Sequence, residues 1–357
     1  MMPKVLLLQG TIKLYRIPIY NLISQNVDLT VAYTDKNESI EKQLYKTIKL
    51  DYKRIIGFFI NTNGFFKICS QFDILIFMSD LHYLSYCSLP FIRRKYKVIA
   101  WSIGIRASYS RRYDVTRKKD FIDMLYGMVL KNSDAVIFYM KAPIKFWGSI
   151  IDLHKVFIAH NTVKVSDTEI KKNQEKNRIL FIGSLYKEKK IYELIESYIE
   201  AKMECKTEKF LYLDIIGKGP EYANIKASID ERGLAESIIL HGPIYDEKVL
   251  AHYFSKSLIC VSPDQAGLSV LKSMGNGVPF VTRINAITGG ERLNIINQVN
   301  GVLYNSQDEL RLIIEEAFNC PEKYITMGKN AHQYYLSNAT PEKMAQGAID
   351  AINFVVK

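Results

Sequence analysis

Short apolar runs alternate with helical stretches twice along this chain of 357 residues, and this alternation constrains the fold more than any other feature. The runs are apolar at consecutive positions, as in residues 4–9 and 73–78, which is typical of parallel strands buried on both faces. Helical candidates such as residues 17–24 and 120–131 lie between them. The sequence therefore predicts an α/β fold with doubly wound parallel sheets and right-handed crossovers.

The pattern forms two sets of elements, one in each half of the chain. We expect strands of the first set at residues 4–9, 27–33, 73–78, 97–101, 134–139 and 156–159. We expect strands of the second set at residues 178–182, 212–216, 237–240, 258–261 and 280–282. Ligands of such sheets bind beyond the carboxyl ends of the strands, so we expect two Rossmann-like sheets that face each other across a central cleft.

A polar stretch at residues 166–177 has no apolar periodicity, and we interpret it as an interdomain linker. Residues 1–165 then form a first Rossmann-like domain, and residues 178–340 form a second. A helix at residues 341–357 is a candidate to cross back to the first domain. The chain length agrees with two domains.

Positive charge is concentrated in the first half of the chain. Residues 1–165 hold 25 of the 48 Lys and Arg residues but only 12 of the 37 Asp and Glu residues, with dense stretches at 93–97 and 111–119. This excess favours an anionic partner, such as lipid, nucleic acid or a charged substrate, although a solvated surface also explains it. No nucleic-acid-binding motif is readable, so we expect an anionic membrane surface and no nucleic acid.

Two aromatic pairs, Phe58-Phe59 and Phe65-Phe66, lie among basic residues, as in an interfacial helix, although the same aromatics fit a core. The longest apolar runs are about a third of the length that spans a membrane, and no signal peptide is apparent. The five cysteines are scattered and form no CxxC pair. We therefore expect a cytoplasmic protein without a metal site.

Glycine turns follow several strands of the second set. Gly267, with Leu268 and Ser269 behind it, opens a helix after a strand, and such a turn suits a diphosphate because a ligand can approach the backbone and the first helix amides. Gly183 and Ser184 likewise precede a lysine-rich helix start. Ordinary helix entry and solvated lysines explain each turn equally well by itself.

Two further turns complete this set. Gly217 begins a strand–turn–helix segment that lacks the third glycine of a dinucleotide fingerprint. Glu291 follows a Thr-Gly-Gly stretch and places a carboxylate on a loop. The order and spacing of the four turns carry more information than any one of them.

Residues 178–335 resemble the C-terminal, donor-binding domain of retaining glycosyltransferases of family 4, which have the GT-B fold. The similar segments are residues 182–185 with Lys189 (family pattern G-R-L … K-G), 217–220 (G-x-G-P), 267–274 with 277–279 (G-L-P-x-L-E-A-M … G-x-P) and 300–303 (N-G-x-L). Residues 1–165 resemble bacterial surface-polysaccharide glycosyltransferases in outline only.

The chain departs from the family pattern at four positions where the family has a charged or ionisable residue. The paired glutamates of the family fall on Asp264 and Lys272, its phosphate-binding arginine on Ser184, and a histidine of its N-terminal domain on Ile103. Asp264 still accepts hydrogen bonds from sugar hydroxyls, whereas the Lys272 ammonium only donates. We expect Lys272 to pair with a phosphate or with Glu291.

The resemblance implies a donor site for a nucleotide sugar in the second domain and an acceptor site in the first. Expected donor- or phosphate-binding residues are Gly183, Ser184, Lys189, Gly217, Gly267, Leu268, Ser269, Lys272 and Glu291. Expected acceptor-binding residues, on loops after strands of the first domain, are Gly10, Arg16, His82, Arg106 and Asn161. Expected catalytic residues are Asp264, Lys189 and Asp80, the last to position an acceptor hydroxyl.

The resulting hypothesis is a retaining, metal-independent glycosyltransferase. It would move a sugar to a glycan or lipid-linked acceptor in capsule, O-antigen or exopolysaccharide synthesis, as a peripheral protein on the inner face of the plasma membrane. No metal cofactor is expected, because no Asp-x-Asp run follows a strand. The alternative is a catalytically silent GT-B protein that binds a glycan or a partner.

Overall fold

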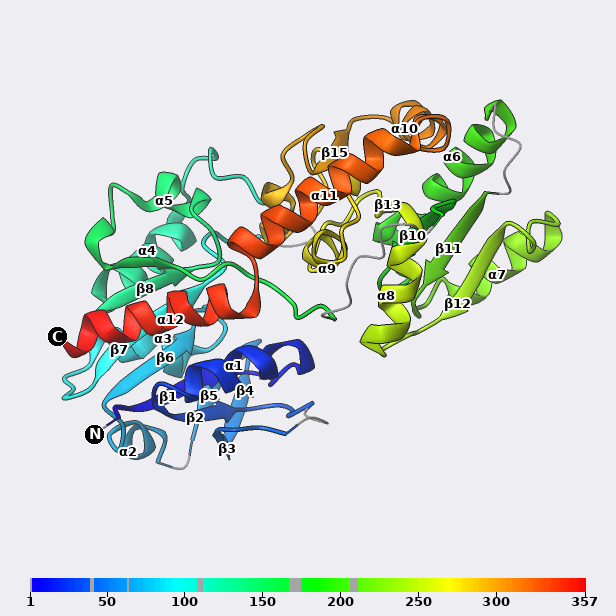
Figure 1. Ribbon diagram of the computed structural model, residues 1–357. Coiled ribbons are helices and arrows are strands. Elements are labelled where there is room, and N and C mark those ends of the chain that lie inside the picture. The colour runs from blue at the N-terminus through cyan, green and yellow to red at the C-terminus, as the bar shows by residue number, and fades with distance from the viewer. Residues whose placement is uncertain (1, 39–41, 63, 108–111, 167–174, 206–210) are drawn as a thin grey trace. The chain divides into compact units, whose positions relative to one another are not determined.

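The computed structural model describes residues 2–38, 42–62, 64–107, 112–166, 175–205 and 211–357 (Figure 1). It divides into two compact units. Unit 1 comprises Met1–Arg106, Asp114–Val163 and Thr340–Lys357, and unit 2 comprises Ala107–Tyr113 and Lys164–Ala339. Residue 111 of the second basic stretch and residues 167–174 of the expected linker lie outside the described residues.

Unit 1 contains a seven-stranded parallel sheet in the order β3-β2-β1-β6-β7-β8-β9. Its strands are β1 (Lys4–Gln9), β2 (Asp28–Tyr33), β3 (Lys46–Lys49), β6 (Ile74–Met78), β7 (Lys97–Ser102), β8 (Ala135–Phe138) and β9 (Val156–Ile158). Its helices are α1 (Ile17–Ser24), α2 (Phe65–Cys69), α3 (Leu84–Ser88), α4 (Phe121–Asn132), α5 (Ala142–Trp147) and α12 (Pro341–Val356). The consecutive apolar positions of β1 explain its burial, since Val5 and Leu7 pack with α1 and α12 while Leu6 and Leu8 are fully buried as well.

Two features of unit 1 differ from the sequence interpretation. Phe58 and Phe59 lie in β5 (Phe58–Asn61), which pairs antiparallel with β4 (Tyr52–Ile55), and not in an interfacial helix. Phe65 is buried at the start of the five-residue α2, and Phe66 is half exposed. The edge strand β3 was not predicted, because its sequence KTIK is largely exposed and lacks the apolar run that marks the other strands.

Unit 2 contains a six-stranded parallel sheet in the order β12-β11-β10-β13-β14-β15. Its strands are β10 (Arg178–Ile182), β11 (Tyr212–Ile216), β12 (Ile238–Gly242), β13 (Ser257–Val261), β14 (Phe280–Arg283) and β15 (Gly301–Tyr304). Its helices are α6 (Ile191–Glu204), α7 (Tyr222–Glu231), α8 (Glu247–Ser255), α9 (Ser269–Gly275), α10 (Gln307–Asn319) and α11 (Pro321–Asn338). Among the described residues no helix is long and apolar enough to cross a membrane.

Helices cover both faces of the unit 2 sheet. Along β10, Ile179 and Phe181 belong to the core cluster shared with α6, α7 and α10, whereas Leu180 belongs to the cluster shared with α8, α9 and α11. Side chains of a strand point alternately to opposite faces, so a continuous apolar run buries both. The predicted fold class of two doubly wound parallel sheets is confirmed.

The last helix, α12, packs in unit 1 against α1, β8 and β9. Met344, Ala348 and Ile352 of this helix are fully buried in the cluster that contains β1 and α1. At Gly347 the helix approaches β9 so closely that an added Cβ would lie 2.1 Å from the Ile158 carbonyl oxygen. Only glycine permits this contact.

We predict that Gly347→Val lowers the stability of unit 1, because the new side chain forces α12 away from β9. The expected loss is about 1–3 kcal/mol, the usual cost of overpacking. Thermal unfolding and limited proteolysis at α12 measure it. Gln346→Val, an exposed change on the same helix, serves as the control, and equal effects of the two variants would contradict the prediction.

Candidate functional site

Two glycine turns at the carboxyl edge of the unit 2 sheet are joined by backbone hydrogen bonds. The Gly183 amide donates to the Ile216 carbonyl at 3.0 Å, and the Leu185 amide donates to the Lys218 carbonyl at 2.9 Å. A Cβ at Gly217 would lie 1.8 Å from the Gly183 carbonyl oxygen. Gly217 is therefore needed for the close approach of the two turns, and it fixes the position of the Gly183–Ser184 backbone.

Lys189 is a buried cation beside this pair of turns. Its side chain is 7% exposed, and a Cβ placed on Gly183 would lie 3.5 Å from its Nζ atom. Burial lowers the pKa of Lys189 to about 8. The neighbouring Cys260 thiol supplies no negative charge, because burial raises its pKa to about 12.

Lys189 differs from other buried charges of the protein in its partners. Asp214 pairs with Arg178 at 2.8 Å and with His241 at 2.7 Å, and the Lys176 ammonium donates to the Ser257 carbonyl at 2.8 Å. Among the residues that the structure describes, Lys189 forms neither an ion pair with a carboxylate nor a side-chain hydrogen bond. The Lys189 ammonium therefore lacks a counter-charge among the described residues, although its Nζ atom is not fully enclosed, and an anion bound beside Gly183 would supply one.

The next residue, Lys190, adopts a left-handed backbone conformation with φ of 51°. This conformation is unfavourable for residues other than glycine and marks local strain. Lys190 is the N-cap of α6, and its ammonium lies 3.8 Å from Asp264, a buried carboxylate that also lies 3.4 Å from Arg112. The strained residue Lys190 thus places a second ammonium near Asp264, the expected catalytic carboxylate.

The helix α9 begins at Ser269, with Leu268 as its N-cap and no side chain capping the first amides. Gly267 faces open space, because a Cβ there would meet no atom within 4 Å. Lys272 pairs with Glu247 of α8 at 2.5 Å, so its partner is not Glu291 as expected. Glu291 is buried and accepts hydrogen bonds from Thr288 and from the Gly289 amide, which orders its loop.

In unit 1, three expected residues lie at strand ends. Asp80 accepts a hydrogen bond within the Asp80–His82 pair, whose Oδ1 and Nδ1 atoms are 2.7 Å apart, and both side chains are exposed. Gly10 approaches Tyr83 so closely that a Cβ would lie 2.1 Å from its hydroxyl oxygen. The structure thus brings Asp80 and His82 together, and their role toward an acceptor stays a prediction.

The two expected arginines of unit 1 are engaged in contacts within the unit. Arg16 is buried and donates to Tyr139 at 2.7 Å, to Asn161 at 2.8 Å and to the Met344 sulfur at 3.0 Å. The structure therefore places Arg16 and Asn161 together, beside α12.

Arg106 pairs with Asp120 at 2.5 Å and with Asp123 at 2.9 Å, where it supports the capped start of α4. Arg117 also pairs with Asp123, and these contacts hold the pKa of Asp123 well below its usual range despite burial. Arg106 thus has a structural role that the sequence did not reveal, because its partners lie 14 and 17 residues away.

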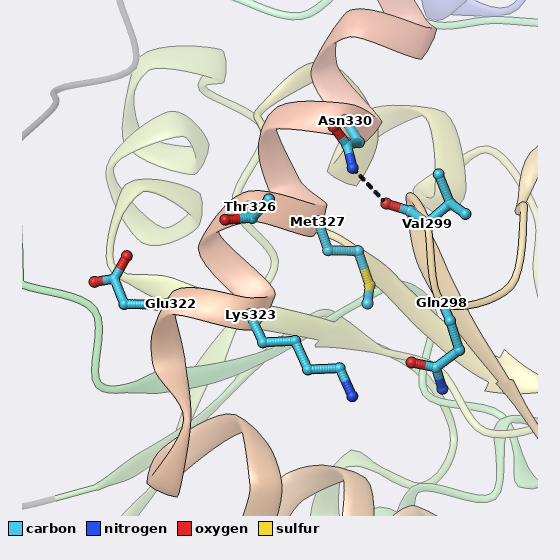
Figure 2. Close-up of a pocket in the computed structure, with 7 residues that line it drawn as sticks. All are labelled: Gln298, Val299, Glu322, Lys323, Thr326, Met327 and Asn330. Carbon is cyan, nitrogen blue, oxygen red and sulfur yellow. Dashed lines mark hydrogen bonds between the residues drawn. The ribbon is translucent and has the colours of Figure 1, made fainter.

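Unit 2 also contains a pocket, whose lining residues are drawn in Figure 2. It has a volume of about 440 Å³ and lies between α11 and the loop at Gln298 and Val299, where the Asn330 amide donates to the Val299 carbonyl at 3.0 Å. None of its seven lining residues is an expected site residue. No group of three or more His, Cys, Asp or Glu side chains suited to a metal occurs in the described part of the chain.

Comparison with known proteins identifies relatives of the segment that contains the turns. Residues 164–334 match the family model "Glycosyl transferases group 1". A poly(glycerol-phosphate) alpha-glucosyltransferase of Bacillus subtilis is 25% identical over 236 residues, which are 60% of this chain and 33% of that protein. The match thus spans a third of the length of this relative.

Solved structures show the same fold over nearly the whole chain. HepE of Anabaena, in complex with UDP and glucose, has a TM-score of 0.70 and 15% identity, with 98% of this chain and 99% of that chain covered. Sucrose-phosphate synthase from Thermosynechococcus elongatus has a TM-score of 0.68 and 16% identity, with 99% and 100% covered. Together these findings support the glycosyltransferase group 1 superfamily and the GT-B fold.

We predict that Lys189→Met raises the melting temperature at pH 7, because methionine fills the same buried volume without an unpaired charge. The expected gain is on the order of 1–3 kcal/mol. Lys187→Met, an exposed change in the same turn, is the control and should leave the melting temperature unchanged.

The gain should depend on pH in a defined direction. Because the folded-state pKa of Lys189 is about 8 and its ordinary value is 10.5, the folded protein releases this proton first as pH rises. Wild-type stability then increases between about pH 8 and pH 10.5, and the difference from Lys189→Met narrows. A constant difference between pH 7 and pH 10 would contradict the burial of a charged Lys189.

Proposed function

We propose that this protein is a retaining glycosyltransferase of family 4, which moves a sugar from a nucleoside diphosphate sugar to a glycan or lipid-linked acceptor without a metal ion. The observation that carries the proposal is the buried Lys189 side chain beside the Gly183 turn, whose ammonium has no partner among the described residues. The group 1 family match of residues 164–334 supports it. The context we propose is bacterial capsule, O-antigen or exopolysaccharide synthesis.

Lys189 would stabilise the leaving diphosphate. Negative charge builds on that group as the bond to the sugar breaks, and a preorganised cation in a site of low dielectric typically contributes ~3–4 kcal/mol to the transition state. The Gly183 and Gly267 backbones leave room for the phosphates. The Leu268 and Ser269 amides would donate hydrogen bonds to the same diphosphate. Retention follows from attack on the same face of the sugar, with a leaving-group oxygen taking the proton of the acceptor hydroxyl.

Carboxylates would orient the two substrates. Asp264 would accept hydrogen bonds from hydroxyls of the donor sugar, and the side chains of Lys190 and Arg112 lie 3.8 Å and 3.4 Å from its carboxylate. Lys272 is neutralised by Glu247, so Glu247 brings an acceptor oxygen to the region where the family has its second glutamate. Asp80, paired with His82, positions the acceptor hydroxyl from unit 1.

Similar proteins suggest which substrates to test first. The HepE structure contains UDP and glucose, and the Bacillus subtilis relative is named an alpha-glucosyltransferase. A structure of TarM from S. aureus, with a TM-score of 0.58 and 17% identity over 78% of this chain and 55% of that chain, contains alpha-GlcNAc-glycerol and UDP. We therefore propose UDP-hexoses as donors and a glycan or a polyol-linked lipid as acceptor, at the cytoplasmic face of the membrane.

A catalytically silent GT-B protein is the second candidate, and the Lys272–Glu247 pair favours it. This pair and Ser184 replace groups that bind the donor in the family pattern. A silent protein would bind a glycan without turnover. Measurable transfer from any nucleotide sugar excludes it.

We predict that one class of UDP-, GDP-, dTDP- or CMP-sugar raises the melting temperature of the wild-type protein, because a ligand that binds only the folded state stabilises it. The same donor should be consumed with an acceptor present, in the presence of EDTA, and the product should keep the anomeric configuration of the donor by NMR. Lys189→Met should abolish the thermal shift and Lys187→Met should retain it. Equal shifts in both variants would refute the role of Lys189.

We also predict that Gly267→Asp lowers kcat/KM by roughly 100-fold or more, since its carboxylate would repel the diphosphate. The open space at Gly267 allows both Asp and Asn to fit, so the melting temperatures should stay unchanged. Gly267→Asn has the same shape without the charge, and its loss should be at least about tenfold smaller. Identical losses in the two variants would argue against an anion at this turn.

A further inference from the structure

The outer face of α4 in unit 1 consists of apolar side chains. Between Phe121 and Met128 every exposed position is apolar, and the exposed residues are Phe121, Ile122, Met124, Leu125 and Met128. Phe121 is 72% exposed and Met124 is 59% exposed. A helix on the surface of a soluble domain normally presents polar residues there, so this face requires an apolar environment.

The opposite face of α4 is fixed to the rest of unit 1. The Tyr126 hydroxyl lies 2.6 Å from the Ser102 hydroxyl, and a Cβ at Gly127 would lie 3.0 Å from the Trp147 ring. Asp120 caps the first turn in a capping box with Asp123. These contacts exclude a rotation of the helix that would bury the outer residues.

Cations flank the apolar face. Lys118 and Lys119 are exposed directly before α4, and Lys131 is exposed at its end. The short helix Leu89–Phe91 lies beside α4, its Phe91 is 55% exposed, and the exposed Arg93 and Lys95 follow it.

The two acidic groups at the start of α4 do not offset this charge, and the exposed Asp114 lies near Arg117. Asp123 is buried between Arg106 and Arg117, and Asp120 pairs with Arg106. The surface around α4 is therefore apolar at its centre and cationic at its rim.

We propose that the outer face of α4 docks this protein onto an anionic lipid bilayer, with the apolar side chains inserted among the acyl chains and the lysines on the head groups. Apolar insertion and electrostatic attraction together are the two signals that stable peripheral binding needs. A second copy of this chain fits less well, because either two-fold arrangement through α4 brings cations together: parallel helices place Lys118 and Lys119 near the same lysines of the partner, and antiparallel helices place them near its Lys131. The docking surface rests on the membrane-face location proposed above and names the element responsible for it.

The test is sedimentation of the full chain with vesicles of phosphatidylcholine alone or mixed with phosphatidylglycerol. The wild-type protein should bind the anionic vesicles, and Phe121→Gln/Met124→Gln/Leu125→Gln should weaken binding by about tenfold or more. Lys118→Gln/Lys119→Gln should weaken binding and reduce its dependence on salt. Met203→Gln/Leu312→Gln, which removes side chains 78% and 51% exposed on helices of unit 2, should bind as the wild type does.

Donor-induced thermal shift provides the folding control and separates this inference from the proposed function. The α4 triple variant should keep the wild-type shift. If neither the wild type nor the triple variant binds a donor, and vesicle binding follows the pattern expected above, the proposed function is refuted and the docking surface is still supported. Wild-type vesicle binding by the triple variant would overturn the docking surface, as would a wild-type dimer that the triple variant dissociates without any binding to vesicles.

Discussion

Burial of parallel strands on both faces is the constraint on which the rest of the structure depends. The central strands of the two sheets use their side chains for packing, as Ile179 and Leu180 of β10 do on opposite faces. Groups that could bind a ligand then lie mainly in the turns after the strands. The hydrogen-bonded turns at Gly183 and Gly217 and the strained Lys190 all lie in such positions.

The residues of the candidate site lower the stability of the folded protein. Burial of the Lys189 side chain disfavours its charged form and lowers its pKa from 10.5 to about 8. Lys190 adds backbone strain beside it. Asp214 is neutralised by Arg178 and His241, whereas Lys176, whose pKa burial also lowers to about 8, bonds only to backbone carbonyls. The case for a ligand at Lys189 therefore rests on its position beside the Gly183 turn.

The sequence predicted the fold better than it predicted the contacts of the site. Consecutive apolar positions and glycine turns are local signals, and they located β10, β11 and the start of α9 correctly. The partner of Lys272 was missed because Glu247 lies 25 residues away on another helix, and distance along the sequence gives no sign of it. The strained backbone of Lys190 had one signal, a lysine where the family pattern has glycine.

The expected anionic partner of the first half stays a prediction, but the structure changes which surface we associate with it. The excess of basic residues in the first half indicated an anionic partner, yet the aromatic pairs chosen for it lie partly in a hairpin and partly in the core. The run FIDMLYGMVLKN of α4 was predicted only to be helical, since composition cannot say which of its apolar residues face outward. Only the anchoring of Tyr126 and Gly127 to the unit 1 core decides that.

Because α12 packs in unit 1, the two units can complete their folds only in a particular order during synthesis. Unit 2 is almost contiguous in sequence, so its sheet has all its strands once residue 304 has emerged. Unit 1 lacks Met344, Ala348 and Ile352 of its core until synthesis reaches residue 352, although its strands were made first. The half of the molecule that is translated earliest is therefore completed last, and it must avoid aggregation in the meantime with an uncovered apolar sheet face.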